Sequence, residues 1–288
     1  MKKTLLCAAA ALLLSACATA PDRGPQIDHS YTSENQDSRS LFLVLHYTVL
    51  DWEKSLKVLT TGGRVSAHYL VRENPAQIYQ LVDENRRAWH AGASYWSGNQ
   101  NLNSSSIGIE IVNPGFTDTP LGRVYAPFPQ AQIDQVKLLV KDIAKRQGIR
   151  PERIIGHADI APGRKQDPGP AFPWKQFADD GIIPWPDAAQ VAAKIPLYEG
   201  LPPDAAWFQA RLGRIGYNIG HTGEFDKLTT DVISTFQMKY RPSNYSGQPD
   251  AETAALIDVA TSPGGMRLAK SVDAAAPLAP APAAADER

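Results

Sequence analysis

Two histidines and one aspartate of this 288-residue chain stand where a metal site needs its ligands. His46 follows the apolar run at 41–45, and His157 follows Ile-Ile-Gly at 154–156. Asp167 comes ten residues after His157, across a segment rich in proline and glycine. Two imidazoles and one carboxylate form a catalytic zinc set that leaves one position for water. These three residues alone leave a structural or surface role open, because the chain has no HExxH helix.

Hydrolysis at such a centre also needs a base and a donor to the developing oxyanion. Glu110 is a candidate base, since it interrupts the apolar segment at 107–112, where an unpaired carboxylate is costly. A side chain facing a cleft and one facing solvent both explain its presence. Lys165 stands two residues before Asp167, so in an extended loop both point the same way. Lys165 is then either an oxyanion donor beside the metal or a surface lysine.

The elements that must position these residues follow a mixed α/β pattern. We expect strands near 41–45, 68–72, 77–82, 107–112 and 153–157, the last of them ending in His157. Apolar periodicity predicts helices at 51–59 and 130–147. The fold class is therefore a mixed central sheet flanked by helices, within a domain at 40–187. The polar and aromatic segment 83–106 is a long loop, and such loops are usually functional.

A second unit is predicted at 200–261 from an internal near-repeat. GEFDKLT at 223–229 and GQPDAET at 247–253 each contain a glycine turn and an aspartate N-cap, and each leads into a helix. Together with a helix near 205–213 they make a small three-helix domain. The alanine- and proline-rich tail at 262–288 is expected to be disordered.

The N-terminus has the composition of a signal peptide. Two lysines precede a short apolar run that ends in Leu-Ser-Ala-Cys at 14–17. This ending resembles the lipobox of bacterial lipoproteins, which predicts a signal peptide at 1–16, lipidation of Cys17 and a polar tether at 17–39; an ordinary secretory signal is the alternative. Ala18 replaces the aspartate that retains lipoproteins in the inner membrane. The resemblance therefore implies lipid anchoring in the outer membrane, facing the periplasm.

Cysteine and charge counts restrict the chemistry further. The chain has two cysteines, Cys7 and Cys17, so after processing no thiolate is free to act as a nucleophile or a metal ligand. The formal charge of −1 becomes −3 when Lys2 and Lys3 leave with the signal. This balance gives no indication of nucleic-acid binding.

Five blocks together resemble the amidase-2 family of zinc N-acetylmuramoyl-L-alanine amidases. This family is related to phage-lysozyme amidases and peptidoglycan recognition proteins. The blocks occur in the family's order: HYT at 46–48, VSAHY at 65–69, AWHAG at 88–92, NSSSIGIE at 103–110 and GHADIAPGRKQDPG at 156–169. The lipobox and the C-terminal unit make the resemblance closest to an outer-membrane lipoprotein amidase. The C-terminal repeat resembles a three-helix peptidoglycan-binding domain.

The resemblance implies a role for each residue of the constellation. His46, His157 and Asp167 would bind one zinc ion per chain, Glu110 would act as general base, and Lys165 would stabilise the oxyanion. The bond cut would join the lactyl group of N-acetylmuramic acid, possibly in its anhydro form, to L-alanine of the stem peptide. The partners are peptidoglycan and muropeptides, and we expect a monomer. Trp89 and His90 would line the substrate groove. His68 would either contact substrate or only pack, and Arg72 and Arg164 could bind carboxylates of the peptide or the lactyl group.

Three other functions compete with this one. A peptidoglycan-binding lipoprotein without catalysis would have little reason to keep His46, His157, Asp167, Glu110 and Lys165 together. A zinc carboxypeptidase would use a His/Asp/His set of different spacing, which is not found here. A purely structural tether would leave the N-terminal constellation unexplained.

Overall fold

The computed structural model describes residues 24–61, 63–120 and 122–270. The predicted signal peptide, Cys17 and the tail after residue 270 lie outside the described residues. Residues 24–37 are exposed and contain no helix or strand, as expected of a tether. They belong to a first unit ending at Asp37, and all that follows concerns the second unit, from Ser38 onward. No helix in the described ranges is long and apolar enough to cross a bilayer.

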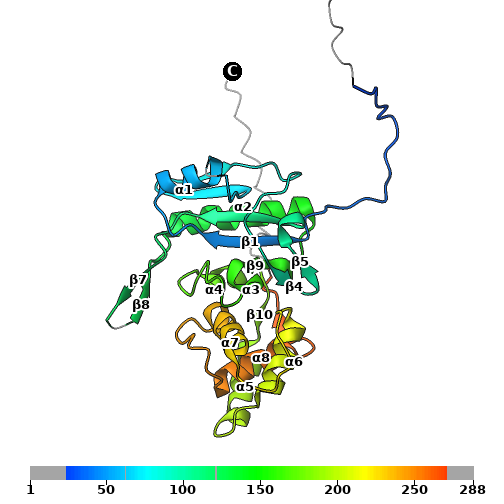
Figure 1. Ribbon diagram of the computed structural model, residues 1–288. Helices are drawn as coiled ribbons and strands as arrows, with labels where there is room; N and C mark the ends of the chain where they lie inside the picture. The colour runs from blue at the N-terminus through cyan, green and yellow to red at the C-terminus, as the bar shows by residue number, and fades with distance from the viewer. Residues whose placement is uncertain (1–23, 62, 121, 271–288) are drawn as a thin grey trace, which may run out of the picture. The chain divides into compact units, whose positions relative to one another are not determined.

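A five-stranded mixed sheet is the framework of the site (Figure 1). The antiparallel edge strand β3 pairs with β2, and β2, β6, β1 and β9 follow in parallel. The strands in sheet order are β3 (Ala76–Gln80), β2 (Tyr69–Glu73), β6 (Ser106–Ile111), β1 (Phe42–Tyr47) and β9 (Ile154–Gly156). The predicted fold class is confirmed, because this is a mixed sheet with helices on its flanks.

The central strand β1 is buried along its whole length, as its continuous apolar run predicts. Its side chains alternate between two cores. Leu43 and Leu45 pack in the first core with helix α2 (Gln130–Gln147), which has the predicted bounds. Phe42 and Val44 pack in the second core. Helices therefore cover both faces of the strand that ends in the candidate metal ligand.

The short helix at 157–160 and the C-terminal helices together cover the face of Phe42 and Val44. The second core joins these two residues to buried residues of the C-terminal helices, such as Phe208 and Phe236. The helices are α5 (Ala188–Tyr198), α6 (Ala205–Ile215), α7 (Lys227–Tyr240) and α8 (Ala251–Ala260). We call α5–α8 the helical module. The sequence did not predict that the module would share a core with the sheet.

The predicted N-caps of the module are confirmed. The side chain of Asp226 accepts from the backbone N–H of Thr229, and that of Asp250 accepts from Thr253. Each satisfies an N–H group that has no partner within its helix. Helix α5 occupies residues left between the two predicted domains. Lys194 of α5 forms an ion pair with Asp258 of α8, so α5 belongs to the module. The described part of the module therefore has four helices, where three were expected.

Three further local expectations need correction. His157 does not end strand β9 but begins the short helix α3 (His157–Ile160), with Gly156 as its cap. The long loop 83–106 contains a small hairpin of β4 (Tyr95–Trp96) and β5 (Asn99–Gln100). The predicted disorder from residue 262 is wrong for Met266 and Arg267, which form β11 and pair with β10 (Trp185–Pro186).

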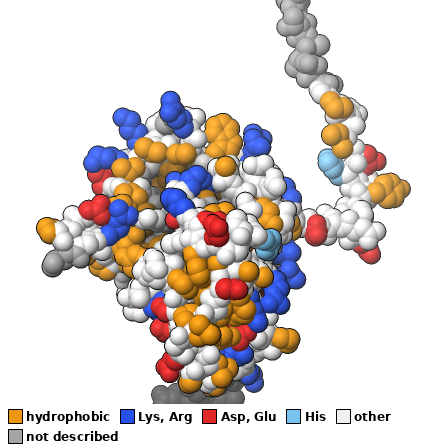
Figure 2. Space-filling view, turned by 60° about the horizontal axis from the view of Figure 1, so that its bottom comes forward, with side chains coloured by type: hydrophobic (Ala, Val, Ile, Leu, Met, Phe, Trp, Pro, Cys, Tyr) orange, Lys and Arg blue, Asp and Glu red, His pale blue; other side chains and the backbone are white. Residues whose placement is uncertain are grey.

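The remaining elements lie around this framework. Asp51 caps α1 (Trp52–Thr60), close to the predicted helix. The other helix and the second hairpin are α4 (Trp174–Asp179), β7 (Phe116–Thr119) and β8 (Gly122–Tyr125). On the face in Figure 2, acidic, basic and apolar side chains are intermixed. That face shows no single-sign surface of the kind that binds nucleic acid.

Candidate metal centre and active-site cleft

His46, His157 and Asp167 meet at the carboxyl end of strand β1. Nδ1 of His46 lies 2.9 Å from Nδ1 of His157, and each of these nitrogens lies 3.0 Å from Oδ2 of Asp167. Adjacent ligand atoms of a tetrahedral zinc site stand about 3.3 Å apart, given metal–ligand bonds of about 2.0 Å. Three donor atoms of the types that zinc prefers thus converge at nearly the required spacing. Among the described residues this is the one group of three or more potential ligands that comes together.

Local backbone structure brings the second and third ligands together. His157 is the first residue of helix α3, and the backbone N–H of Ala158 donates to the carbonyl of Asp167 at 2.8 Å. The segment between His157 and Asp167 is thereby closed into a loop at its base. The segment rich in proline and glycine therefore forms a closed support for two of the candidate ligands.

The protonation of this group suits metal binding. Burial, with the neighbouring His157, lowers the pKa of His46 to about 4, so its imidazole is neutral at physiological pH. Burial alone would raise the pKa of Asp167, but the adjacent His157 and His46 outweigh it and hold that pKa well below its usual range. Neutral imidazole and ionised carboxylate are the forms that coordinate zinc.

A chain of hydrogen bonds fixes the ring of His46 from behind. Its Nε2 lies 3.0 Å from Nδ1 of His90, and Nε2 of His90 lies 3.3 Å from Oγ of Ser106. The Ser106 hydroxyl in turn donates to the carbonyl of Leu102 at 2.5 Å. Because the Ser106 hydroxyl donates its proton to this carbonyl, its oxygen can accept from Nε2–H of His90. Nδ1 of His90 then accepts from Nε2–H of His46, which leaves Nδ1 of His46 unprotonated and able to bind a metal. Such outer partners set the tautomer and the orientation of a histidine ligand.

The second histidine ligand is held in a similar way. Nε2 of His157 lies 3.1 Å from the carbonyl oxygen of Ala91, so its Nδ1 faces the metal position. The side chain of Asn103 accepts from the backbone N–H groups of His90 and Ala91, at 3.0 and 2.7 Å. Asn103 thereby anchors the loop that orients both histidine ligands. Asn103 and Ser106 had no predicted role, because spacing along the chain gives no sign of these contacts.

Gly108 makes room for the His90 ring. A Cβ atom built on Gly108 would lie 2.4 Å from Cγ of His90 and 2.6 Å from its Nδ1. Real Cβ atoms do not approach so closely, so any larger residue must displace the ring that supports His46. Only glycine at this position of β6 is compatible with the observed support.

We expect Gly108→Ala to weaken metal binding about 10- to 100-fold, the usual effect of losing an outer partner of a metal ligand. Competition with a chelator measures this change. Gly213→Ala is the matched control, because its Cβ would meet nothing nearer than 3.7 Å. Equal metal affinity in the two variants would contradict the proposed support by His90.

Glu110 faces the same cleft from the neighbouring strand. It is the register partner of His46 in the parallel pair β1–β6. Burial, together with the charge of Asp167, raises the pKa of Glu110 to about 8. Within the described part of the chain its Oε2 is buried without a hydrogen-bond partner. Of the two interpretations of this residue, the structure supports the cleft-facing one.

The cleft has a volume of about 200 Å³ and two different walls. One wall is polar and is formed by the candidate ligands His157 and Asp167 with His90, Glu110 and Lys165. The other is apolar and contains Val49, Leu50, Val58, Leu59 and Val65. Val49 adopts a φ of 56°, which is strained for a β-branched residue. Lys165 and Asp167 line one cleft, as their spacing predicted.

The residues predicted to bind substrate do not gather in this cleft. His68 is wholly buried, its Nδ1 accepting from the N–H of Gly108 and its Nε2 lying 3.1 Å from the carbonyl oxygen of Arg86, so of its two alternatives the structure supports packing. Arg72 stacks over the ring of Trp52 and is not among the residues that line the cleft.

The other three lie closer to the centre. Arg164 donates to the carbonyls of Ala91 and Ala93, so its guanidinium already has protein partners. His90 lines the cleft, but both its ring nitrogens contact protein. Trp89 is 49% exposed in the adjoining loop, and its contact with substrate remains a prediction.

Comparison with known proteins agrees with this geometry. The family model "N-acetylmuramoyl-L-alanine amidase" matches residues 36–170, and "Putative peptidoglycan binding domain" matches residues 202–257. The chain is 42% identical over 272 residues to N-acetylmuramoyl-L-alanine amidase AmiD of Escherichia coli K12, covering 90% of this chain and 97% of that protein. It is 40% identical over 114 residues to 1,6-anhydro-N-acetylmuramyl-L-alanine amidase AmpD of the same strain, covering 40% and 57%.

Two solved structures share most of the fold. The Escherichia coli AmiD complex with anhydro-N-acetylmuramic acid-L-Ala-D-γ-Glu-L-Lys superposes with a TM-score of 0.74, covering 82% of this chain and 93% of AmiD, at 42% identity. AmpDh3 of Pseudomonas aeruginosa, in complex with anhydromuramic pentapeptide, gives a TM-score of 0.73 at 40% identity, covering 81% and 96%. These matches extend through both the sheet and the helical module. The chain belongs to the N-acetylmuramoyl-L-alanine amidase family.

Proposed function

We propose that this chain uses one zinc ion, held by His46, His157 and Asp167, to hydrolyse the amide between the lactyl group of N-acetylmuramic acid and L-alanine of the stem peptide. The observation that carries the proposal is the convergence of three ligand atoms within 3.0 Å of one another, beside an unpaired carboxylate oxygen. Zinc in such a set supplies Lewis acidity, which polarises a carbonyl oxygen and makes water more acidic.

The chain's own residues supply the proton transfers and the charge stabilisation. Oε2 of Glu110 has no partner among the described residues, so it can accept the proton of the attacking water and pass it to the leaving amine. The Lys165 ammonium lines the same cleft and can donate to the oxygen on which negative charge develops. Ionised Glu110 and cationic Lys165 are therefore both needed in the reactive form.

The substrate class follows from the relatives and from the cleft. AmiD and AmpDh3 were solved with anhydromuramyl peptides, which supports the anhydro form as one substrate of this chain. The apolar wall suits the methyl groups that flank the scissile amide, on the lactyl group and on L-alanine. The match to a peptidoglycan-binding family supports wall binding by the helical module.

Mass spectrometry of muropeptides incubated with lipid-free protein tests the activity. We expect release of free stem peptide, which stops when a chelator removes the metal and returns when zinc is added. Intact muropeptides under all conditions, with binding to isolated cell walls retained, would support the competing function of a non-catalytic binder.

The N-terminal sequence supports a location for this activity. A lipobox ending in Cys17 and followed by Ala18 is the basis for proposing a lipoprotein of the outer membrane, facing the periplasm. Incorporation of labelled palmitate into the wild type but not into Cys17→Ala, with fractionation of the membranes, tests this location. Label in neither protein would favour an ordinary secretory signal.

A further inference from the structure

Residues of the helical module contact one buried carboxylate close to the candidate metal site. Asp159 lies in helix α3, two residues after the ligand His157, and is 3% exposed. Its Oδ2 accepts from the backbone N–H of Gly156 at 2.9 Å, so it caps the helix that His157 begins. No part of the proposed reaction uses this carboxylate, and a buried charge of this kind needs partners.

Two residues of the helical module provide those partners. The hydroxyl of Tyr217 donates to Oδ1 of Asp159 at 2.9 Å, and Nζ of Lys239 lies 3.2 Å from Oδ2. Tyr217 follows helix α6 and Lys239 lies in α7, so they come from two parts of the module. The side chains of both are buried, at 3% and 8% exposed.

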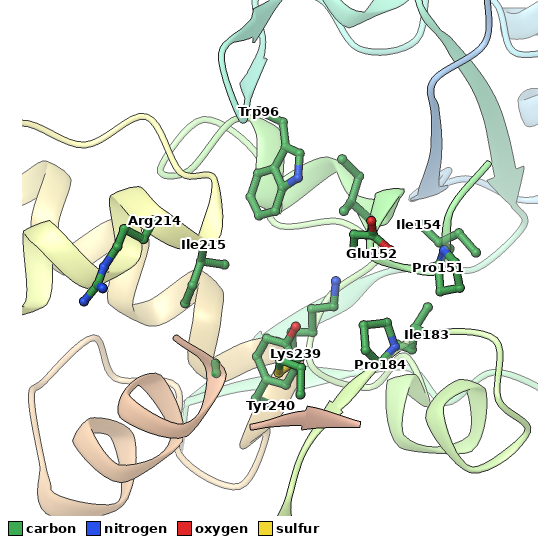
Figure 3. A pocket seen from close by; sticks show the side chains of 13 residues that line it. Trp96, Pro151, Glu152, Ile154, Ile183, Pro184, Arg214, Ile215, Lys239 and Tyr240 are labelled. Carbon is green, nitrogen blue, oxygen red and sulfur yellow. The ribbon is translucent and has the colours of Figure 1, made fainter. Parts of the chain in front are cut away.

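Contacts with the catalytic domain hold both partners in place. The Lys239 ammonium lies 4.3 Å from the ring centre of Trp174, and the ring of Tyr217 packs edge-on against Trp96 at 4.9 Å. Figure 3 shows Lys239 and Tyr240 lying across a cavity from Trp96, with Ile154 of β9 on its wall. This cavity, of about 210 Å³, is lined by residues of both the sheet domain and the module. The module is thus packed directly against strand β9, which precedes His157, and helix α3, which begins at His157.

We propose that the helical module is a positioning element of the metal centre, in which Tyr217 and Lys239 hold Asp159 and thereby fix the turn that presents His157. The module then has a task in the reaction that is separate from binding the cell wall. This inference rests on the proposed role of His157 as a metal ligand. Tyr217 and Lys239 touch neither substrate nor metal, so they are positioning residues.

The test compares two buried or half-buried lysine–aspartate pairs. Lys239→Met removes the cation that reaches Asp159. Lys194→Met removes one of the two cations that pair with Asp258, a cluster that lies within the module. Both variants are made in the full chain carrying Cys17→Ala, so that no lipid is attached. Thermal unfolding reports how far each change destabilises the protein.

Zinc affinity, measured by competition with a chelator, is the deciding readout. We expect Lys239→Met to raise the zinc dissociation constant about 10- to 100-fold, as removal of an outer partner of a ligand does. Lys194→Met is expected to leave it within about twofold even where its loss of stability is similar. The visible spectrum of the cobalt-substituted protein should change for Lys239→Met alone, because it reports ligand geometry. Turnover of a small soluble muropeptide, which needs no wall binding, should fall in parallel.

Two more conservative variants keep the test decisive if Lys239→Met does not fold. Tyr217→Phe removes only the hydroxyl that reaches Asp159 and keeps the ring against Trp96, and it should weaken zinc binding in the same direction. Lys239→Arg keeps a cation and should restore part of the affinity. If Lys239→Met and Tyr217→Phe bind zinc as Lys194→Met does, the contact is packing only and the inference fails. If the wild type itself binds no zinc, the proposed function fails first.

Discussion

Glu110→Gln is expected to lower turnover of muropeptides about 10²- to 10⁴-fold while the protein still binds zinc. Glutamine keeps the size of the side chain but has no carboxylate to accept the proton of water. Because Glu110 is not one of the three converging ligands, its loss leaves the metal set intact. Rates of stem-peptide release, together with the zinc content of the purified variant, measure the two parts of this prediction.

Glu73 offers a matched control for Glu110. It also has a buried carboxylate oxygen without a hydrogen-bond partner among the described residues, but it is not one of the residues that line the cleft. Glu73→Gln should therefore retain near-normal turnover. Normal turnover by Glu110→Gln, or its purification without metal, would show that Glu110 is not the base.

The raised pKa of Glu110 gives the same variant a signature in the metal-free protein. The pKa is about 8 in the folded chain and about 4.5 for an ordinary glutamate, so the folded state holds this proton more tightly than the unfolded state. Protonated Glu110 therefore contributes to the free energy of unfolding. This contribution is fully present below pH 4.5 and is lost as the pH rises through 8. Glu110→Gln should remove this loss. The free energy of unfolding of both metal-free proteins, measured with a chemical denaturant across this pH range, should show the contribution of Glu110. It should fall more steeply with rising pH for the wild type than for Glu110→Gln.

Asp167→Ala is expected to lose zinc and activity together. Asp167 supplies the one carboxylate oxygen of the set, and removal of its negative charge also leaves His46 and His157 facing one another at 2.9 Å. We expect the zinc dissociation constant to rise at least about 100-fold, the upper end of the effect of losing an outer partner. Chelator competition and stem-peptide release measure the two losses.

Added zinc separates this variant from Glu110→Gln. Excess zinc should restore part of the activity of Asp167→Ala by mass action, whereas it should do nothing for Glu110→Gln. Asp142→Asn is a control, since Asp142 makes an exposed ion pair with Arg146 on helix α2. Full zinc affinity in Asp167→Ala would remove Asp167 from the ligand set.

The sequence predicted that His46, His157 and Asp167 come together, because their placement depends on strand ends and on family motifs. A buried apolar run that stops at a histidine puts that histidine at the rim of a sheet, and β1 does this for His46. Helix α2 and the aspartate caps were predictable for a similar reason, since periodicity and capping are local properties.

The support of the ligands was not predictable in this way. His90 and His68 come from neighbouring family blocks, and the sequence made His90 a substrate contact and left His68 open between substrate contact and packing. Both are buried in the structure: His90 lies within hydrogen-bond distance of His46, and His68 accepts from the backbone N–H of Gly108. Which partner a buried imidazole takes depends on residues far away in the chain, such as Ser106, and spacing along the sequence carries no information about it.

The two-sided burial of strand β1 limits how this enzyme can be re-engineered. Phe42, Val44, Ile155 and Ile160 form one apolar surface, part of which the helical module covers. A shortened chain that ends before α5 would expose that part to water and would be prone to aggregate. Exchange of the module for an unrelated targeting domain has the same consequence, unless these four positions are redesigned with polar side chains. A chimera that leaves these positions unchanged must therefore keep the sheet domain and the module as one unit.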